Sequence, residues 1–168
     1  VFEGLIRSAQ QQHSFISDKD ITKDVRLAEK KTNLKRFIEQ IRPEFAKFLL
    51  SQHRYREAAV EYELLGDAKG ILRAAALAEG GNHLYEAAEC RRIAADLYSN
   101  DGNYAESREH RIIAGKLAEQ IGMLEIAEEH YAEAGDERAH ANIQVEKADR
   151  KQCIAIERKA EVGVGMLE

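Results

Sequence analysis

The side chains of this chain that could do chemistry include six histidines and two cysteines, set among thirty acidic residues. Glu137 and His140 form a Glu-x-x-His pair, the spacing with which di-iron carboxylate bundles place two metal ligands on one helix face. Such a centre needs a second pair and two further glutamates on facing helices, and no second Glu-x-x-His occurs in the sequence. A metal-carboxylate helical bundle is therefore only a remote alternative, and no metal or cofactor is predicted.

Four other histidines are scattered along the chain. His53 and His83 stand near predicted turns, whereas His110 and His130 stand beside glutamates. We expect each of them at the surface or at a helix cap rather than as a ligand.

No arrangement of nucleophiles or glycines predicts catalysis. Gly163-Val164-Gly165 lacks the preceding strand and following helix that a dinucleotide-binding loop requires, and no serine or cysteine has a base nearby in sequence. Cys90 and Cys153 fall in separate predicted helices without a surrounding pattern, so no disulfide is expected. Two lone thiols favour a reducing, cytoplasmic location. The sequence thus predicts a protein that is not an enzyme.

A phrase of thirteen residues occurs twice, at 55–67 and again at 124–136. In both copies an alanine precedes a tyrosine by four positions, and a Gly-Asp pair follows four positions later. The residues are Ala58, Tyr62, Gly66 and Asp67 in the first copy, and Ala127, Tyr131, Gly135 and Asp136 in the second. The spacing puts alanine and tyrosine on one helix face, while Gly-Asp ends that helix and caps the next. Recurrence of this unit predicts stacked helical hairpins.

The first 52 residues have a different character. Apolar spacing predicts a helix over 1–16, a loop over 17–20 and a capping residue at Asp20 or Thr22. The next helix carries a heptad-like seam formed by Leu27, Leu34, Ile38, Ile41, Phe45 and Phe48. Pro43 interrupts this seam, and we expect a helix break near Arg42 because the residue before proline avoids helical angles. The seam could pack on the chain's own repeats or on a second copy.

From residue 53 onward, turn signals recur along the chain. Turn signals at Gly66-Asp67, Gly80-Gly81-Asn82, 100–103, Gly122 and Gly135-Asp136 separate segments with helical apolar spacing. We therefore predict an all-α fold of about eight helices, with antiparallel hairpins stacked as a short α-solenoid. It divides into an N-terminal helical segment (1–52), repeats (53–136), a capping helix (137–160) and a disordered tail (161–168).

The repeats resemble the tetratricopeptide family and the related helical hairpins of SNAP-type and vesicle-coat solenoids. The resemblance rests on the opening Gly102-Asn103-Tyr104-Ala105-Glu106-Ser107, preceded by Ala95 and Tyr98, and on partial matches at 55–58 and 84–87. The family period is 34 residues, and Ala58 and Ala127 lie 69 residues apart. Intermediate openings at Ala88 and Ser107 break that period, so the array is irregular, and a closed bundle stays an alternative. The resemblance implies protein binding and no catalytic chemistry.

Charge is unevenly distributed along the chain. Residues 19–56 contain eleven lysines and arginines and five acidic residues, a net charge of +6, which leaves −11 for the rest of a chain of net charge −5. The acidic remainder would repel phosphates and so argues against nucleic-acid binding. No apolar run approaches the length of a membrane span.

These observations together predict a non-catalytic scaffold or adaptor that binds a protein or peptide partner on its repeats, as part of a larger protein or of a trafficking-type assembly. Arginine and tyrosine are over-represented at interface hot spots, which makes the predicted contact residues Arg73, Arg91, Arg92, Tyr98, Arg108 and Arg111. The same arginines could instead pair with neighbouring glutamates. The alternative function is an architectural segment that self-associates as a homo-oligomer through the 27–48 seam.

Overall fold

The computed structural model describes residues 2–15 and 25–164, with side-chain surroundings given for residues 2–14 and 29–158. All eight elements in these ranges are α-helices, which confirms the predicted all-α fold. They are α1 (Phe2–Phe15), α3 (Val25–Ser51), α4 (Tyr55–Glu63), α5 (Ala68–Gly80), α6 (Leu84–Asn100), α7 (Tyr104–Gln120), α8 (Leu124–Ala134) and α9 (Glu137–Val164). The predicted loop at 17–20 and the predicted caps Asp20 and Thr22 lie outside the described residues.

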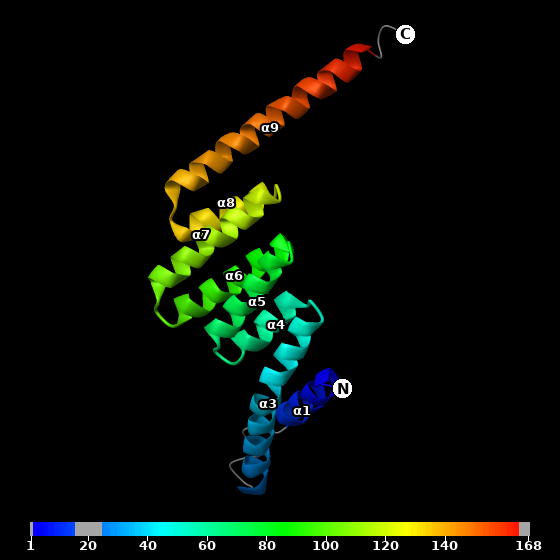
Figure 1. Ribbon diagram of the computed structural model, residues 1–168, viewed down its shortest axis with the longest axis vertical. Coiled ribbons are helices and arrows are strands. Elements are labelled where there is room, and N and C mark those ends of the chain that lie inside the picture. Colours follow the sequence, from blue (N-terminus) through cyan, green and yellow to red (C-terminus); the bar gives the residue numbers. More distant parts are fainter. Residues whose placement is uncertain (1, 16–24, 165–168) are drawn as a thin grey trace.

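The helices stack as antiparallel neighbours into an elongated rod (Figure 1). Each helix from α3 to α8 packs on the next one along the chain, and α4 also packs on α6. α1 and α3 form one end, and α9 leaves the other end as a long projecting rod (Figure 1). None of the described helices combines the length and the apolar character that crossing a bilayer requires.

The Gly-Asp pairs act as the sequence predicts. Gly66 and Gly135 adopt left-handed angles, with φ of 68° and 65°, after the last turns of α4 and α8. Each following aspartate caps the next helix. The Asp67 carboxylate accepts a hydrogen bond from the Gly70 N–H at 2.9 Å, and Asp136 accepts one from the Ala139 N–H at 3.0 Å. A cap of this kind stabilises a helix by about 1 kcal/mol.

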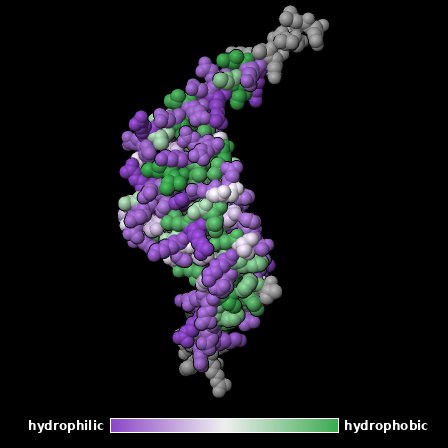
Figure 2. All heavy atoms as spheres, in the orientation of Figure 1, coloured by the Kyte–Doolittle hydropathy of each residue, from purple (hydrophilic) through white to green (hydrophobic). Residues whose placement is uncertain are grey.

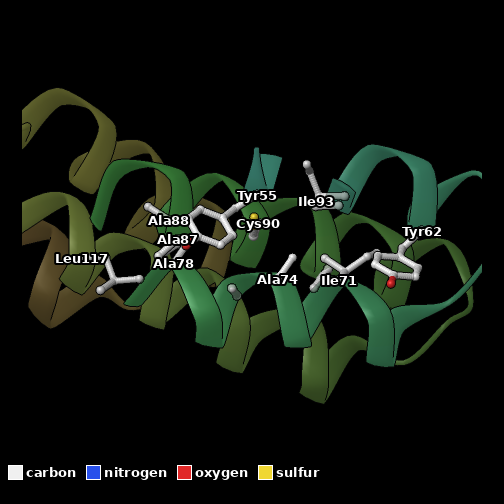
Figure 3. Close-up of a cluster of buried hydrophobic side chains, with 14 of the residues drawn as sticks. Tyr55, Tyr62, Ile71, Ala74, Ala78, Ala87, Ala88, Cys90, Ile93 and Leu117 are labelled. Carbon is white, nitrogen blue, oxygen red and sulfur yellow. The ribbon is translucent and has the colours of Figure 1, made fainter. Parts of the chain in front are cut away.

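Alanines line the helix contacts of the core. Ala74, Ala78, Ala87 and Ala94 are completely buried between α5 and α6. Figure 3 shows such alanines interspersed with larger side chains, among them Tyr55 and Cys90. Because alanine has no side chain beyond Cβ, the helix axes can approach closely along the stack.

Two tyrosines of the repeated phrase lie directly over glycines of the neighbouring helix. A Cβ built on Gly70 would clash with Cδ1 of Tyr62, and one built on Gly115 would stand 2.8 Å from Cε1 of Tyr131. Both tyrosines are at least 95% buried. In each copy of the phrase, the tyrosine ring therefore packs directly on the backbone of the adjacent helix, at a glycine that has no side chain.

The expected break near Arg42 is wrong. α3 runs without interruption from Val25 to Ser51 and contains Pro43. Proline removes one backbone hydrogen bond, but α3 packs against both α1 and α4 just after it. Phe45 and Leu49 pack with Ile6 of α1 and Ala58 of α4, so tertiary contacts override the local preference.

The C-terminal helix is longer than expected. α9 reaches Val164, four residues beyond the predicted end of the capping helix, so a disordered tail from residue 161 is wrong for 161–164. The glycine within these four residues lowers helix stability by only about 1 kcal/mol, which the neighbouring helical residues can offset. Residues 165–168 lie outside the described residues.

Candidate protein-binding surfaces

A chain of ion pairs runs across the repeats and includes two of the predicted contact residues, Arg92 and Arg111. Arg111 of α7 pairs with Asp96 of α6 and, at 2.7 Å, with Glu133 of α8. Arg92 pairs with Asp96 at 2.8 Å and with Glu89 at 3.4 Å. The chain continues to Arg56 of α4, which lies 3.5 Å from Glu89. We call these six residues, Arg56, Glu89, Arg92, Asp96, Arg111 and Glu133, the charge ladder.

The position of Arg111 in the ladder is structural. Its side chain is only 15% exposed and joins three successive helices. Arg92 is 33% exposed and pairs along its own helix. Both arginines therefore pair with neighbouring acids, the alternative that the sequence left open. Arg111 is nearly buried in these pairs, whereas one third of the Arg92 side chain stays exposed.

Arg91 and Tyr98 belong to a separate contact network. Arg91 donates to Glu79 of α5 at 2.9 Å, and its Nη1 lies 3.4 Å from Nδ1 of His110 on α7. The Tyr98 ring stacks on His110 with centroids 5.5 Å apart. Arg91, Tyr98 and His110 thus link α6 to its two neighbours, and the structure does not join them to the charge ladder.

Arg73 and Arg108 are the exposed members of the predicted set. Arg73 on α5 has no ion pair among the described residues, and Arg108 on α7 makes only a long, 3.5 Å contact with the Gly135 carbonyl oxygen. Their guanidinium groups are therefore available to a partner at little cost to the fold.

Two histidines expected at the surface are instead buried. His110 is 9% exposed and His130 is 2% exposed, because both face the interior between α6, α7 and α8. Burial, reinforced by Arg91, lowers the pKa of His110 below its ordinary value. Burial and Arg111 likewise lower the pKa of His130, whose ring nitrogens have no hydrogen-bond partner among the described residues. The adjacent Glu109 and Glu129 face solvent. The prediction of surface positions was based on these exposed neighbours and was therefore wrong for the two histidines.

The surface that the repeats present to solvent is acidic. Residues 57–136 contain seventeen acidic and seven basic residues, and three of the arginines are committed to the contacts above. Glu106, Glu109 and Glu129 are exposed without an ion pair in the described part of the chain. Tyr104 is 70% exposed at the start of α7. Figure 2 shows hydrophilic side chains along the stack on the face in view, with hydrophobic ones between them.

The predicted self-association seam is mostly used inside the chain. Ile38 and Phe45 are buried, at 9% and 7% exposure, and Phe45 contacts α1. Phe37 is 41% exposed, and Phe48 is 42% exposed. A hollow of about 400 Å³ lies between α1, α3 and the end of α4.

The thiols and carboxylates show no reactive arrangement in the ranges that the structure describes. Cys90 and Cys153 are free, and burial, followed by the Glu86 charge, raises the pKa of Cys90 to about 12. Such a thiol stays protonated and is a poor nucleophile. His140 lies 3.5 Å from Glu128, and no three potential metal ligands gather anywhere in the described ranges.

Comparison of the chain with models of protein families, with curated proteins and with solved structures gave no match. Function must therefore be argued from the stacked helices and their side chains.

Proposed function

We propose that this chain is a non-catalytic, tetratricopeptide-like module that binds a protein or peptide partner along its repeats. The observation that supports it best is the elongated stack of hairpins (Figure 1). Such a stack buries its core between neighbouring helices and exposes a long surface to a partner. The charge ladder adds ion pairs between α4, α6, α7 and α8 to this packing.

The residues that we assign to partner contact are the exposed ones. Arg73, Arg108 and Tyr104 offer side chains of the kinds that dominate interface hot spots. Arg91, Arg92, Arg111 and Tyr98 hold the helices that carry them.

Affinity capture from the native cell, followed by mass spectrometry, tests the proposal. We expect Arg108→Glu combined with Tyr104→Ala to lose the specific partner without a change in melting temperature, because both side chains are exposed. The matched control is Lys116→Glu, another exposed charge reversal on α7. Retention of every captured protein by the double variant would refute the assignment of these residues.

The alternative function is self-association through α3. The half-exposed ring of Phe48, the last residue of the predicted seam, favours it, and Phe37 beside the seam is exposed to a similar degree. Light scattering at high concentration discriminates the two functions, and a strict monomer would exclude the seam as a dimer interface. We further propose a cytoplasmic location, which the two free thiols support.

A further inference from the structure

His130 is a buried titratable side chain that lacks a polar partner. It lies on α8 with 2% of its surface exposed, and neither nitrogen of its ring forms a hydrogen bond within the described residues. Its neighbours one helical turn away, Ala127 and Ala134, are buried as well. A neutral imidazole can be buried in such surroundings at moderate cost, whereas an imidazolium would be a charge removed from water without compensation. The packing of α8 therefore favours a neutral His130.

Charged groups from three helices act on the His130 ring. They are Glu89 of α6, Arg111 of α7, and Glu129 and Glu133 of α8. Glu89 and Glu133 are engaged by arginines of the charge ladder, whereas Glu129 faces solvent. Inside the described part of the stack, a protonated ring could therefore gain a carboxylate only at the expense of an existing ion pair.

The charged side chains that α9 presents to α8 lie on another side of that helix. His140 and Lys147 contact Glu128, at 3.5 Å and 2.6 Å, and Lys147 also lies 3.6 Å from Glu125. Glu128 stands two residues before His130, which places it on a different face of α8. Among the described residues, α9 thus offers His130 no counter-charge.

Arg111 makes protonation costly for the contact between α7 and α8 in particular. Its side chain is 15% exposed and pairs with Glu133 across that contact at 2.7 Å. A positive charge on His130 would repel Arg111 and compete with it for Glu133. Burial, followed by Arg111, holds the pKa of His130 below its ordinary value, although nearby glutamates raise it. Protonation therefore weakens a link between α8 and the rest of the stack.

α8 and α9 can leave α7 without opening the main core. The large core cluster of Figure 3 extends from α3 to α7. Leu124 and Tyr131 of α8 and Ile143 of α9 belong to a second cluster, in which Ala118 represents α7. α8 packs on α7 and α9 at the end of the stack (Figure 1). Because contacts in such a stack are made between neighbours, loss of the contact between α7 and α8 frees the C-terminal pair as one unit.

We propose that protonation of His130 releases α8 and the start of α9 from α7, whereas α3 to α7 stay folded. The release is reversible, because loss of one proton restores the neutral ring. It exposes the face of α7 around Gly115 and Ala118, which α8 otherwise covers. The inference goes beyond the proposed function, since it concerns a conformational change of the chain itself and needs no partner.

Hydrogen exchange followed by mass spectrometry on the full chain tests the proposal. Amide protection, corrected for intrinsic exchange, is compared at about pH 7.5 and about pH 5. One imidazole with an ordinary pKa of about 6.5 in the released state lowers protection by at most about thirtyfold over this interval. We expect a severalfold loss in α8 and in residues 137–143, with recovery on return to the higher pH. At about pH 5, α6 should stay better protected than α8.

Two variants remove the titration of His130, and one variant serves as the matched control. His130→Gln and His130→Phe should both lose most of the pH dependence in α8. The control His140→Gln should keep it, because His140 belongs to the same pair of helices but its side chain is 33% exposed. Each variant is compared with itself at the two pH values, so a constant loss of stability cancels. Circular dichroism confirms that each variant is folded.

Three results would overturn the proposal. Equal protection of α8 and α6 at about pH 5 would show that α8 opens only when the whole chain unfolds. Unchanged protection of α8 between the two pH values would show that His130 is not coupled to its release. A pH dependence that persists in both His130 variants would assign the acid response to another group. The first two results come from the unaltered chain and so do not depend on the folding of any variant.

Discussion

Replacement of Gly115 by alanine should destabilise the stack, although alanine is the better helix former. Gly115 lies inside α7 beneath the ring of Tyr131 from α8. A Cβ there would stand 2.8 Å from Cε1 and 3.0 Å from Cδ1 of that ring. The ring is 98% buried, and its hydroxyl donates to Glu119 at 2.8 Å. It therefore has little freedom to retreat.

The magnitude follows from two opposing effects. Glycine to alanine inside a helix gains about 1 kcal/mol from helix propensity. Inserting a methyl group into a packed contact costs about 1–3 kcal/mol, and loosening the Tyr131 hydrogen bond costs about 1 kcal/mol more. We expect a net loss of about 1–3 kcal/mol in the free energy of unfolding and a melting temperature lower by about 3–9 °C.

Urea unfolding followed by circular dichroism measures this difference. Gly80→Ala is the matched control, since it also replaces a helical glycine but its Cβ would meet no atom within 4 Å. The control should be as stable as the unaltered chain or slightly more so. If Gly115→Ala were equally stable, the contact between α7 and α8 would be looser than the distances indicate and the reasoning would be refuted.

Three further predictions concern charged and titratable side chains. Because burial lowers the pKa of His110 and His130 below 6.5, the unfolded chain takes up these protons first. The free energy of unfolding should therefore be insensitive to His protonation above about pH 6.5 and fall as the pH decreases below it, as urea unfolding at several pH values would show. Arg111→Met should lower the free energy of unfolding by about 1–2 kcal/mol in the same assay, because it removes ion pairs with two carboxylates, one of them also a hydrogen bond. In the folded chain Cys153 should react with a thiol reagent within minutes while Cys90 stays protected, as absorbance after addition of the reagent would show.

Each of these predictions has a control. His130→Gln should reduce the acid sensitivity, and an unchanged pH profile would contradict the burial of His130. Arg73→Glu, at an exposed position, should change stability by less than about 0.5 kcal/mol; an effect as large as that of Arg111→Met would contradict the structural role of the latter. Denaturation should make Cys90 reactive.

The turns and the helices between them could be predicted because their signals are local. Gly66-Asp67 and Gly135-Asp136 combine a residue that tolerates left-handed angles with a side chain that caps the next helix. Both requirements are met within a few residues, so they are visible in the sequence. The break at Pro43 was predicted on the same kind of local evidence and failed, since packing of α3 on α1 and α4 outweighs one lost hydrogen bond.

The candidate site was less predictable because its contacts join distant residues. Arg111 meets Asp96 and Glu133 only after three helices have stacked, and nothing in the sequence distinguishes it from the exposed Arg108. His130 is buried because of the helices on either side of it, not because of its sequence neighbours. Gly70 and Gly115 stand inside helical patterns where glycine is unfavourable, and that local inconsistency could have predicted their close approach to tyrosine rings.

The neighbour-to-neighbour packing of α3 to α8 also has a consequence for folding. Contacts between successive helices close short loops, which lowers the entropic cost of forming them and favours fast folding. Since each hairpin depends on its neighbours alone, α6 and α7 in the middle can order first and then serve as a template for both sides. We expect amide exchange to be slowest in these two helices and progressively faster toward α1 and the free end of α9.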